Sequence, residues 1–200
     1  MHKKLTSRQE LLALRSEVKA ALDRQKIKLL VCAGTGCVAG GSLCIYERLS
    51  ELLAEKGLPY SVELEVEAHD ETVGIKKCGC HGYCEMGPLL RIEPQGWLYT
   101  KVKLEDCEEI IERTVELGEL IERLAYRKNG VIYPRQEDIP FYKKQTRVVL
   151  EHCGRIDAES IEEYIAQDGY TAFERVLFDI DGDQVVKTIK DSGLRGRGGA

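Results

Sequence analysis

Apolar residues recur at helical spacing in the first part of the chain. Ser7 followed by Glu10 is a capping box, and leucines and valines then repeat every three or four positions. This pattern predicts an amphipathic helix within residues 1–24. Residues 27–32 form a short, nearly continuous apolar run that stops at a glycine-rich turn, which predicts a strand covered on both faces. A second helix is expected over residues 42–57, because helical spacing there ends at a glycine.

Strand and hairpin patterns follow. Apolar residues alternate with glutamates over residues 62–67, which predicts a strand with one solvent-exposed face. Residues 89–92 and 97–102 flank a turn that contains proline and glycine, so a hairpin is expected there. Helical spacing returns over residues 104–118. The order strand, helix, strand, hairpin and helix is a compact α/β pattern, and we expect one domain over residues 25–118.

The remainder of the chain has a different character. Residues 119–140 are polar, broken by glycine and proline, and poor in periodicity, which is typical of a linker. Three short helices separated by Gly169 and Gly182 are expected in residues 141–200, which end with four glycines in eight residues. Ordering such an end costs much backbone entropy, so a surface or ligand is expected to organise it. We interpret residues 141–200 as the incomplete start of a second domain, and the chain as the N-terminal part of a longer protein.

Charge and hydropathy limit the classes of partner. Lys and Arg number 29 against 34 Asp and Glu, which gives a net charge of −5, and the acidic residues are spread along the 200-residue chain. Binding to nucleic acid is therefore not expected. No apolar run approaches the roughly 18 residues that span a bilayer, and the first residues lack the apolar core of a signal peptide. We therefore expect a soluble, cytoplasmic protein.

Eight cysteines in a cytoplasmic protein indicate metal binding or redox chemistry rather than disulfides. Two pairs, Cys32 with Cys37 and Cys80 with Cys84, each lie beside a predicted strand end or loop. Four thiolates from two loops suit either a tetrahedral zinc ion or a two-iron, two-sulfur cluster. The spacings of four and three intervening residues favour the wider cluster, with zinc as the alternative. Nearby glycines would let backbone N–H groups approach the sulfur atoms, and these are Gly34, Gly36, Gly79 and Gly82.

The other cysteines are weaker candidates for metal ligands. Cys78 is close enough in sequence to replace one of the second pair, but the pair with three intervening residues is preferred. Cys44 and Cys107 lie on predicted helices, where small core side chains are expected. Cys153 is expected to be structural, and His81 is interpreted as a solvent-facing loop residue. The chain has no Cys-x-x-Cys sequence, so dithiol exchange is disfavoured.

Two sequence runs carry a resemblance to a known family. Cys32–Cys37 (CAGTGC) and Gly79–Pro88 (GCHGYCEMGP) are similar to the cysteine loops of the thioredoxin-like two-iron ferredoxins, and the similarity covers about residues 25–118. Members of that family have a thioredoxin-type fold and hold one [2Fe-2S] cluster in two loops near the surface. The resemblance implies that the cluster ligands are Cys32, Cys37, Cys80 and Cys84.

The glycine-rich end of the chain has a second candidate chemistry. Arg195 and Arg197 lie among glycines directly after a predicted helix. Such a segment exposes backbone N–H groups and guanidinium groups to an anion such as a flavin or dinucleotide phosphate. Taken alone, the pattern fits a disordered tail rich in arginine and glycine equally well.

Three runs near this end carry a second resemblance. Pro140–Gln145, Cys153–Asp157 and Ser192–Ala200 are similar to the start of the FMN-bearing, NADH-oxidising subunit of complex I. They are also similar to its relatives in NAD-linked hydrogenases and formate dehydrogenases. The resemblance covers about residues 135–200 and implies FMN and NAD(H) as cofactors of a longer protein. The implied flavin or nucleotide contacts are Gly196, Arg197, Gly198, Gly199 and Ala200.

Taken together, the expected fold is α/β: a thioredoxin-like [2Fe-2S] ferredoxin domain, a linker, and a mainly helical first piece of an FMN-binding domain. This arrangement is similar to the beta subunit of NADH-dependent, electron-bifurcating [FeFe] hydrogenases. It implies an electron-transfer subunit whose partners are other iron–sulfur subunits. These residues alone are expected to carry electrons but not to oxidise NADH, so no catalytic residue is assigned. Two alternatives stay open, a zinc-stabilised docking module and a free-standing [2Fe-2S] ferredoxin with a disordered tail.

Overall fold

A five-stranded mixed sheet organises the structure, a computed structural model that describes residues 4–61, 72–196 and 198. The strand order is β2-β3-β1-β4-β5. The pairs β2–β3 and β1–β3 are parallel, whereas β1–β4 and β4–β5 are antiparallel. The strands are β1 (Gln25–Cys32), β2 (Tyr60–Ser61), β3 (Thr72–Cys78), β4 (Leu90–Glu93) and β5 (Trp97–Tyr99).

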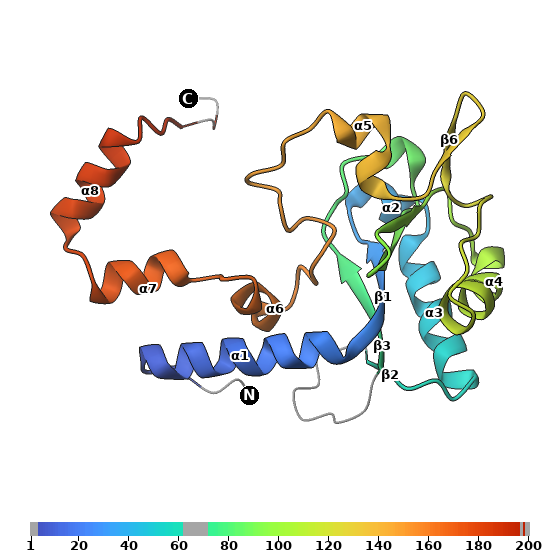
Figure 1. The fold of residues 1–200 in the computed structure, drawn as a ribbon, viewed down its shortest axis with the longest axis horizontal. Helices are drawn as coiled ribbons and strands as arrows, with labels where there is room; N and C mark the ends of the chain where they lie inside the picture. Colours follow the sequence, from blue (N-terminus) through green and yellow to red (C-terminus); the bar gives the residue numbers. More distant parts are fainter. Residues whose placement is uncertain (1–3, 62–71, 197, 199–200) are drawn as a thin grey trace.

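Helices flank this sheet and continue beyond it (Figure 1). None of the described helices is long and apolar enough to cross a membrane. The α-helices are α1 (Arg8–Arg24), α2 (Thr35–Ala39), α3 (Ser42–Glu55), α4 (Cys107–Glu109), α5 (Pro140–Lys143), α6 (Ile161–Ala166), α7 (Thr171–Phe178) and α8 (Gly182–Asp191). The other helical segments are the 3-10 helices η1 (Cys84–Met86), η2 (Leu104–Asp106) and η4 (Gln136–Asp138) and the π-helix η3 (Ile110–Glu116).

Most of the predicted elements are present. α1 begins directly after Ser7, whose hydroxyl accepts a hydrogen bond from the Glu10 N–H at 3.2 Å. α3 is the second predicted helix, β4 and β5 are the predicted hairpin, and η2, α4 and η3 together form the helix predicted after it. β3 was not predicted. The strand predicted over residues 62–67 lies outside the described residues.

The main core lies between one face of the sheet and the helical segments α3, α4 and η3. Leu29 and Val31 of β1 meet Leu49 of α3 and Ile110 of η3 in this core. Leu30, which alternates with them on the strand, is buried as well. The prediction of a strand covered on both faces is therefore confirmed for the second half of β1.

The opposite face of the sheet is covered by α6 and the segment that precedes it. Lys76 of β3, the register neighbour of Leu30, is buried and forms an ion pair with Glu163 of α6. Glu163 also accepts a hydrogen bond from the Asp157 N–H at 3.0 Å. α6 packs against α1 through a small apolar cluster that contains Val18, Leu22 and Ala166.

Residues 119–140, predicted as a linker, instead pack against the sheet. They contain a second, two-stranded sheet, β6 (Tyr126–Lys128) with β7 (Val131–Tyr133). The turn residues Asn129 and Gly130 have φ values of 51° and 80°, as a two-residue hairpin turn requires. The segment is anchored to β5, whose Leu98 N–H donates to the carbonyl of Pro134 at 2.8 Å. Buried apolar residues in this segment include Ile121, Leu124 and Ile139.

The three short helices predicted near the end of the chain are confirmed as α6, α7 and α8. α7 and α8 lie apart from the sheet in Figure 1, and neither contains a buried residue. Arg8 of α1 pairs with Asp179 at the end of α7 at 2.6 Å. We refer to α7 and α8, residues 171–191, as the arm, and to residues 25–143 as the body.

Candidate metal centre

The predicted cysteine pairs lie at one edge of the sheet, where β1 and β3 end. These strands are parallel neighbours, and Cys32 at the end of β1 is in register with Cys78 at the end of β3. The loops that follow two parallel neighbours start at the same edge. Cys37 follows in α2 on the first loop, and Cys80 and Cys84 follow on the second, which we call the second ligand loop, residues 79–87.

The four predicted sulfur atoms form a chain of contacts across these two loops. Cys32 lies within hydrogen-bonding reach of Cys37 and of Cys80, and Cys80 lies within reach of Cys84. Cys37 also interacts electrostatically with Cys84. The structure therefore brings together all four residues that were singled out, and their role as ligands remains a prediction.

The contact between Cys32 and Cys37 separates the pKa values of the two thiols. The hydrogen bond between the two thiols lowers the pKa of Cys32 to about 6. The same bond, together with burial, raises the pKa of Cys37. Burial also raises the pKa of Cys80. A thiolate at Cys32 is the form that binds metals, so this residue is prepared for ligation before any metal arrives.

Three glycines leave room for the sulfur atoms. A Cβ added at Gly34 would lie 2.9 Å from the Cys80 Sγ, and one at Gly36 would lie 3.1 Å from the Cys84 Sγ. A Cβ added at Gly87 would lie 2.8 Å from the Cys37 Sγ. The two loops thus form a cradle that any larger residue would fill. Gly34 and Gly36 were expected near the cysteines, whereas Gly87 was not singled out.

Backbone N–H groups also point at these sulfur atoms. Gly82 donates to the Cys80 Sγ at 3.3 Å. The N–H groups of His81 and Gly34 act on Cys32 and stabilise its thiolate. Such donors offset the negative charge that thiolates and bridging sulfides bring to an iron–sulfur cluster.

The donor set and the cradle fit a [2Fe-2S] cluster. Each iron of such a cluster takes two protein sulfur atoms, so the four thiolates need not converge on a single point. Among residues 4–61, 72–196 and 198, no group of three or more His, Cys, Asp or Glu side chains is arranged around one ion position. Cys32 and Cys37 are buried whereas Cys80 and Cys84 are exposed, so the site reaches the surface on one side.

The remaining cysteines and His81 are placed as follows. Cys78 is buried, and its Sγ donates to the carbonyl of Val31 at 3.4 Å. Cys107 is buried, as predicted, but Cys44 is exposed on the outer face of α3, so its assignment to the core is wrong. Cys153 is half-buried against Gly79.

The interpretation of His81 as a solvent-facing residue is also wrong. Its side chain is only 1% exposed, and its Nε2 lies 3.4 Å from the Cys78 Sγ. Burial lowers the pKa of His81 to about 3, so the imidazole is neutral at physiological pH. Residues far along the chain bury it: a Cβ added at Gly154 would lie 2.5 Å from the imidazole ring.

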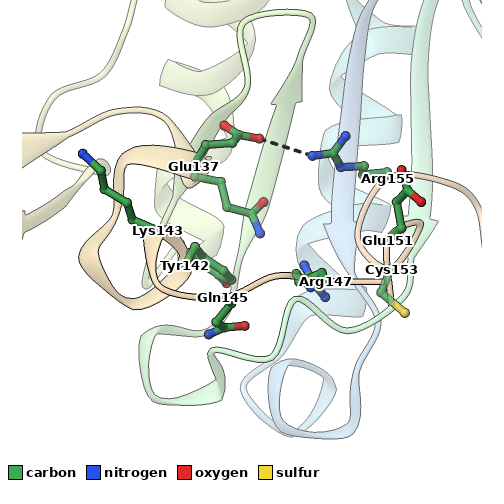
Figure 2. Close-up of a pocket in the computed structure, with 9 residues that line it drawn as sticks. Glu137, Tyr142, Lys143, Gln145, Arg147, Glu151, Cys153 and Arg155 are labelled. Atoms are coloured by element: carbon green, nitrogen blue, oxygen red, sulfur yellow. Dashed lines mark ion pairs between the residues drawn. The ribbon is translucent and has the colours of Figure 1, made fainter. Parts of the chain in front are cut away.

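Residues 136–157 cover the second ligand loop. Asp157 forms an isolated β-bridge with Cys78, which holds the end of this covering segment to the end of β3. Residues of this segment line a pocket of about 390 Å³, and Figure 2 shows Arg147, Cys153 and Tyr142 among them. The ion pair between Arg155 and Glu137, at 3.6 Å, joins two parts of its wall.

The flavin and nucleotide contacts predicted at the end of the chain are not assembled in the described residues. Arg197, Gly199 and Ala200 lie outside them. Gly196 and Gly198 are exposed, and a Cβ added at either would meet open space. Their role in binding a cofactor therefore stays a prediction.

Comparison with known proteins identifies the region that contains the cysteine pairs. Residues 21–115 match the thioredoxin-like [2Fe-2S] ferredoxin family. This range agrees with the similarity inferred from the cysteine runs, and it ends before the covering segment.

Individual relatives include a hydrogenase subunit, a ferredoxin and an NADH-quinone oxidoreductase subunit. The NADP-reducing hydrogenase subunit HndC of Solidesulfovibrio fructosivorans is 52% identical over 58 residues, which are 29% of this chain and 12% of that protein. A 2Fe-2S ferredoxin of Clostridium pasteurianum is 37% identical over 62 residues, 31% of this chain and 61% of that protein. An NADH-quinone oxidoreductase subunit of Buchnera aphidicola is 48% identical over 44 residues, 22% of this chain and 10% of that protein. The matches thus span between a tenth and about three fifths of these relatives.

Proposed function

We propose that the chain is a one-electron carrier, because residues 21–115 match the thioredoxin-like [2Fe-2S] ferredoxin family. The observation that carries this proposal is the contact of four thiols from two loops within a cradle of glycines. A bound [2Fe-2S] cluster would supply one-electron redox chemistry. Its proposed ligands are Cys32, Cys37, Cys80 and Cys84.

The protein's own residues hold the site and connect it to solvent. The buried thiols of Cys32 and Cys37 fix the inner side, where no larger residue than glycine fits at position 87. The exposed pair, Cys80 and Cys84, faces outward, which gives a redox partner a short path to the ligands. Backbone N–H groups around both pairs stabilise negative charge on sulfur, and this favours the reduced state.

We further propose that this carrier is part of an NADH-dependent oxidoreductase. Relatives named as a hydrogenase subunit and as an NADH-quinone oxidoreductase subunit support this assignment. In such an enzyme the ferredoxin domain would pass single electrons between an FMN that NADH reduces and neighbouring iron–sulfur subunits. The segment from Gly196 to Ala200 would contribute to the FMN and NADH site, in agreement with its resemblance to flavoprotein subunits.

Anaerobic reconstitution with iron and sulfide tests the electron-carrier proposal. We expect two irons per chain, a red-brown colour, and a one-electron EPR signal on reduction. Cys37→Ser should lose the signal or hold it only in altered form, because it removes an inner ligand. Cys44→Ser is the matched control, since Cys44 is exposed on α3 and is not one of the four thiols that contact one another. This variant should reconstitute as the unchanged protein does.

Two results would overturn the proposal. A colourless protein that binds one zinc ion per chain through the same cysteines would support the docking-module alternative instead. An iron content and EPR signal that Cys37→Ser leaves unchanged would remove Cys37, and with it the two-loop site, from the ligand set.

A further inference from the structure

A buried tyrosine hydroxyl from outside the ferredoxin match contacts the second ligand loop. Tyr142 lies in α5, beyond residue 115, and only 6% of it is exposed. Its hydroxyl donates a hydrogen bond to the backbone carbonyl of His81 at 3.1 Å. Burial raises the pKa of Tyr142, so the hydroxyl keeps its proton and remains a donor.

The carbonyl that accepts this bond belongs to the same peptide unit as the N–H group that contacts a ligand. The His81 carbonyl and the Gly82 N–H are the two ends of one planar peptide bond. The Gly82 N–H donates to the Cys80 Sγ at 3.3 Å. The two hydrogen bonds therefore form a relay from the Tyr142 hydroxyl, through one peptide unit, to the Cys80 sulfur. Hydrogen bonds in such chains polarise and strengthen one another.

The surroundings of the relay fix its geometry from both ends. The Tyr142 ring packs edge-on against Tyr83, at 5.8 Å between centroids, and against Phe141, at 5.1 Å. On the loop side, the His81 ring is held between the Cys78 Sγ and the backbone of Gly154. The hydroxyl cannot turn away from the His81 carbonyl without disturbing these buried contacts.

We propose that Tyr142 is a positioning residue that raises the reduction potential of the cluster by polarising the N–H group bound to Cys80. This inference rests on the proposed function, because it requires the cluster that the function requires. A more strongly polarised N–H withdraws electron density from the ligand sulfur and stabilises the more negative, reduced state. The covering segment thereby tunes a site to which it contributes no ligand.

The test compares two variants that each remove one buried tyrosine hydroxyl. Tyr142→Phe deletes the first donor of the relay and keeps the ring. Tyr99→Phe is the matched control, since the Tyr99 hydroxyl is buried against Thr114 and the Ile121 N–H, within the core of the same domain. Each protein is reconstituted anaerobically, its iron is counted, and its midpoint potential is measured by redox titration with EPR detection.

Tyr142→Phe should hold the same iron as the unchanged protein at a more negative midpoint potential. The net strength of one hydrogen bond sets the upper limit of this shift, which is roughly tenfold in the reduction equilibrium. Tyr99→Phe should leave the potential unchanged. An unchanged potential in Tyr142→Phe, or an equal shift in both variants, would overturn the inference. Failure of the unchanged protein to bind iron would instead overturn the proposed function.

If Tyr142→Phe binds less iron, its midpoint potential cannot be compared directly, so a second measurement tests the relay without metal. In the metal-free chain, the Gly82 amide proton reports the polarisation of the relay through its NMR chemical shift and its exchange rate. We expect an upfield shift and faster exchange for Gly82 in Tyr142→Phe but not in Tyr99→Phe. If the Gly82 amide is the same in all three proteins, the relay does not exist.

Discussion

The body and the arm have the same kind of hydrophobic pattern but opposite burial. In the body, Leu49 of α3 and Ile110 of η3 are completely buried in the main core. In the arm, apolar residues at similar helical spacing are largely exposed, and they include Phe173, Leu177, Phe178 and Ile189. The comparison shows that periodicity determines where a helix forms, whereas burial depends on whether another surface meets its apolar face.

α6 lies between these two regions and is fastened to the body. Its Glu163 pairs with Lys76 of β3, and the two side chains are 4% and 2% exposed. Arg15 of α1 donates to the Ile165 carbonyl at 3.1 Å, which ties the same helix to α1. The attachment of the helical end of the chain thus depends on polar contacts that the hydrophobic pattern does not contain, in addition to the small apolar cluster between α1 and α6.

The largest effect is expected from breaking the buried ion pair. Glu163→Gln leaves the Lys76 ammonium buried without a countercharge, which should lower the free energy of unfolding by roughly 3–5 kcal/mol. Asp191→Asn breaks the exposed pair with Lys187 in the arm, formed at 2.9 Å, and should cost less than about 0.5 kcal/mol. Urea unfolding followed by circular dichroism measures both.

A second variant separates charge burial from packing in this test. Lys76→Met combined with Glu163→Leu replaces both charges by apolar groups and should recover most of the stability lost in Glu163→Gln. Equal stability of Glu163→Gln and the unchanged protein would mean that α6 is not fastened to the sheet in solution.

Core truncation gives the next largest contrast. Leu49→Ala removes a completely buried side chain, and the cavity should cost roughly 2–5 kcal/mol of unfolding free energy. Ile189→Ala makes a similar change at a residue that is 51% exposed in α8, and the change should stay within about 0.5 kcal/mol. Thermal unfolding of the two variants side by side checks the contrast. A large loss in Ile189→Ala would show that the arm is packed in solution.

Helix capping gives the smallest effect. Asp181 caps α8 by accepting from the Gln184 N–H at 2.8 Å, and Asp181→Ala should weaken that helix by about 1 kcal/mol. Because α8 buries no residue, amide exchange should become roughly fivefold faster within α8 while the unfolding transition of the body stays fixed. Ser7→Ala, which removes the cap of α1, should instead lower the stability of the packed structure. Equal effects of the two substitutions on global unfolding would contradict this distinction.

Much of the fold could be predicted because its signals are local. Capping residues, helical spacing and the glycine and proline of the β4–β5 turn predicted most helices and the hairpin. β3 was missed because Gly74 and two lysines interrupt its apolar pattern, and Lys76 is accommodated only by a partner 87 residues away. The β6–β7 hairpin does have a local signal, Asn129-Gly130, which lies within the range predicted to be a linker.

Within the candidate site, too, the features with local sequence signals could be predicted and those made by distant residues could not. The spacing of the cysteines and their adjacent glycines indicated which four thiols would meet. Burial of His81 and the contact from Tyr142 could not be predicted, because residues 61 to 73 positions further along the chain create them. Burial by residues that are distant in sequence leaves no periodic pattern around the buried residue, so the local sequence does not reveal it.

The contact between α1 and α6 has a consequence for synthesis on the ribosome. The apolar side of α1, at Val18 and Leu22, packs against Ala166, which is translated about 150 residues later. At typical elongation rates this interval lasts roughly 7–30 s, during which α1 is without its final packing partner. The nascent chain therefore completes this apolar contact of its first helix only after the five strands of the sheet have been translated, and conditions that slow translation prolong the period in which that surface is open to chaperones.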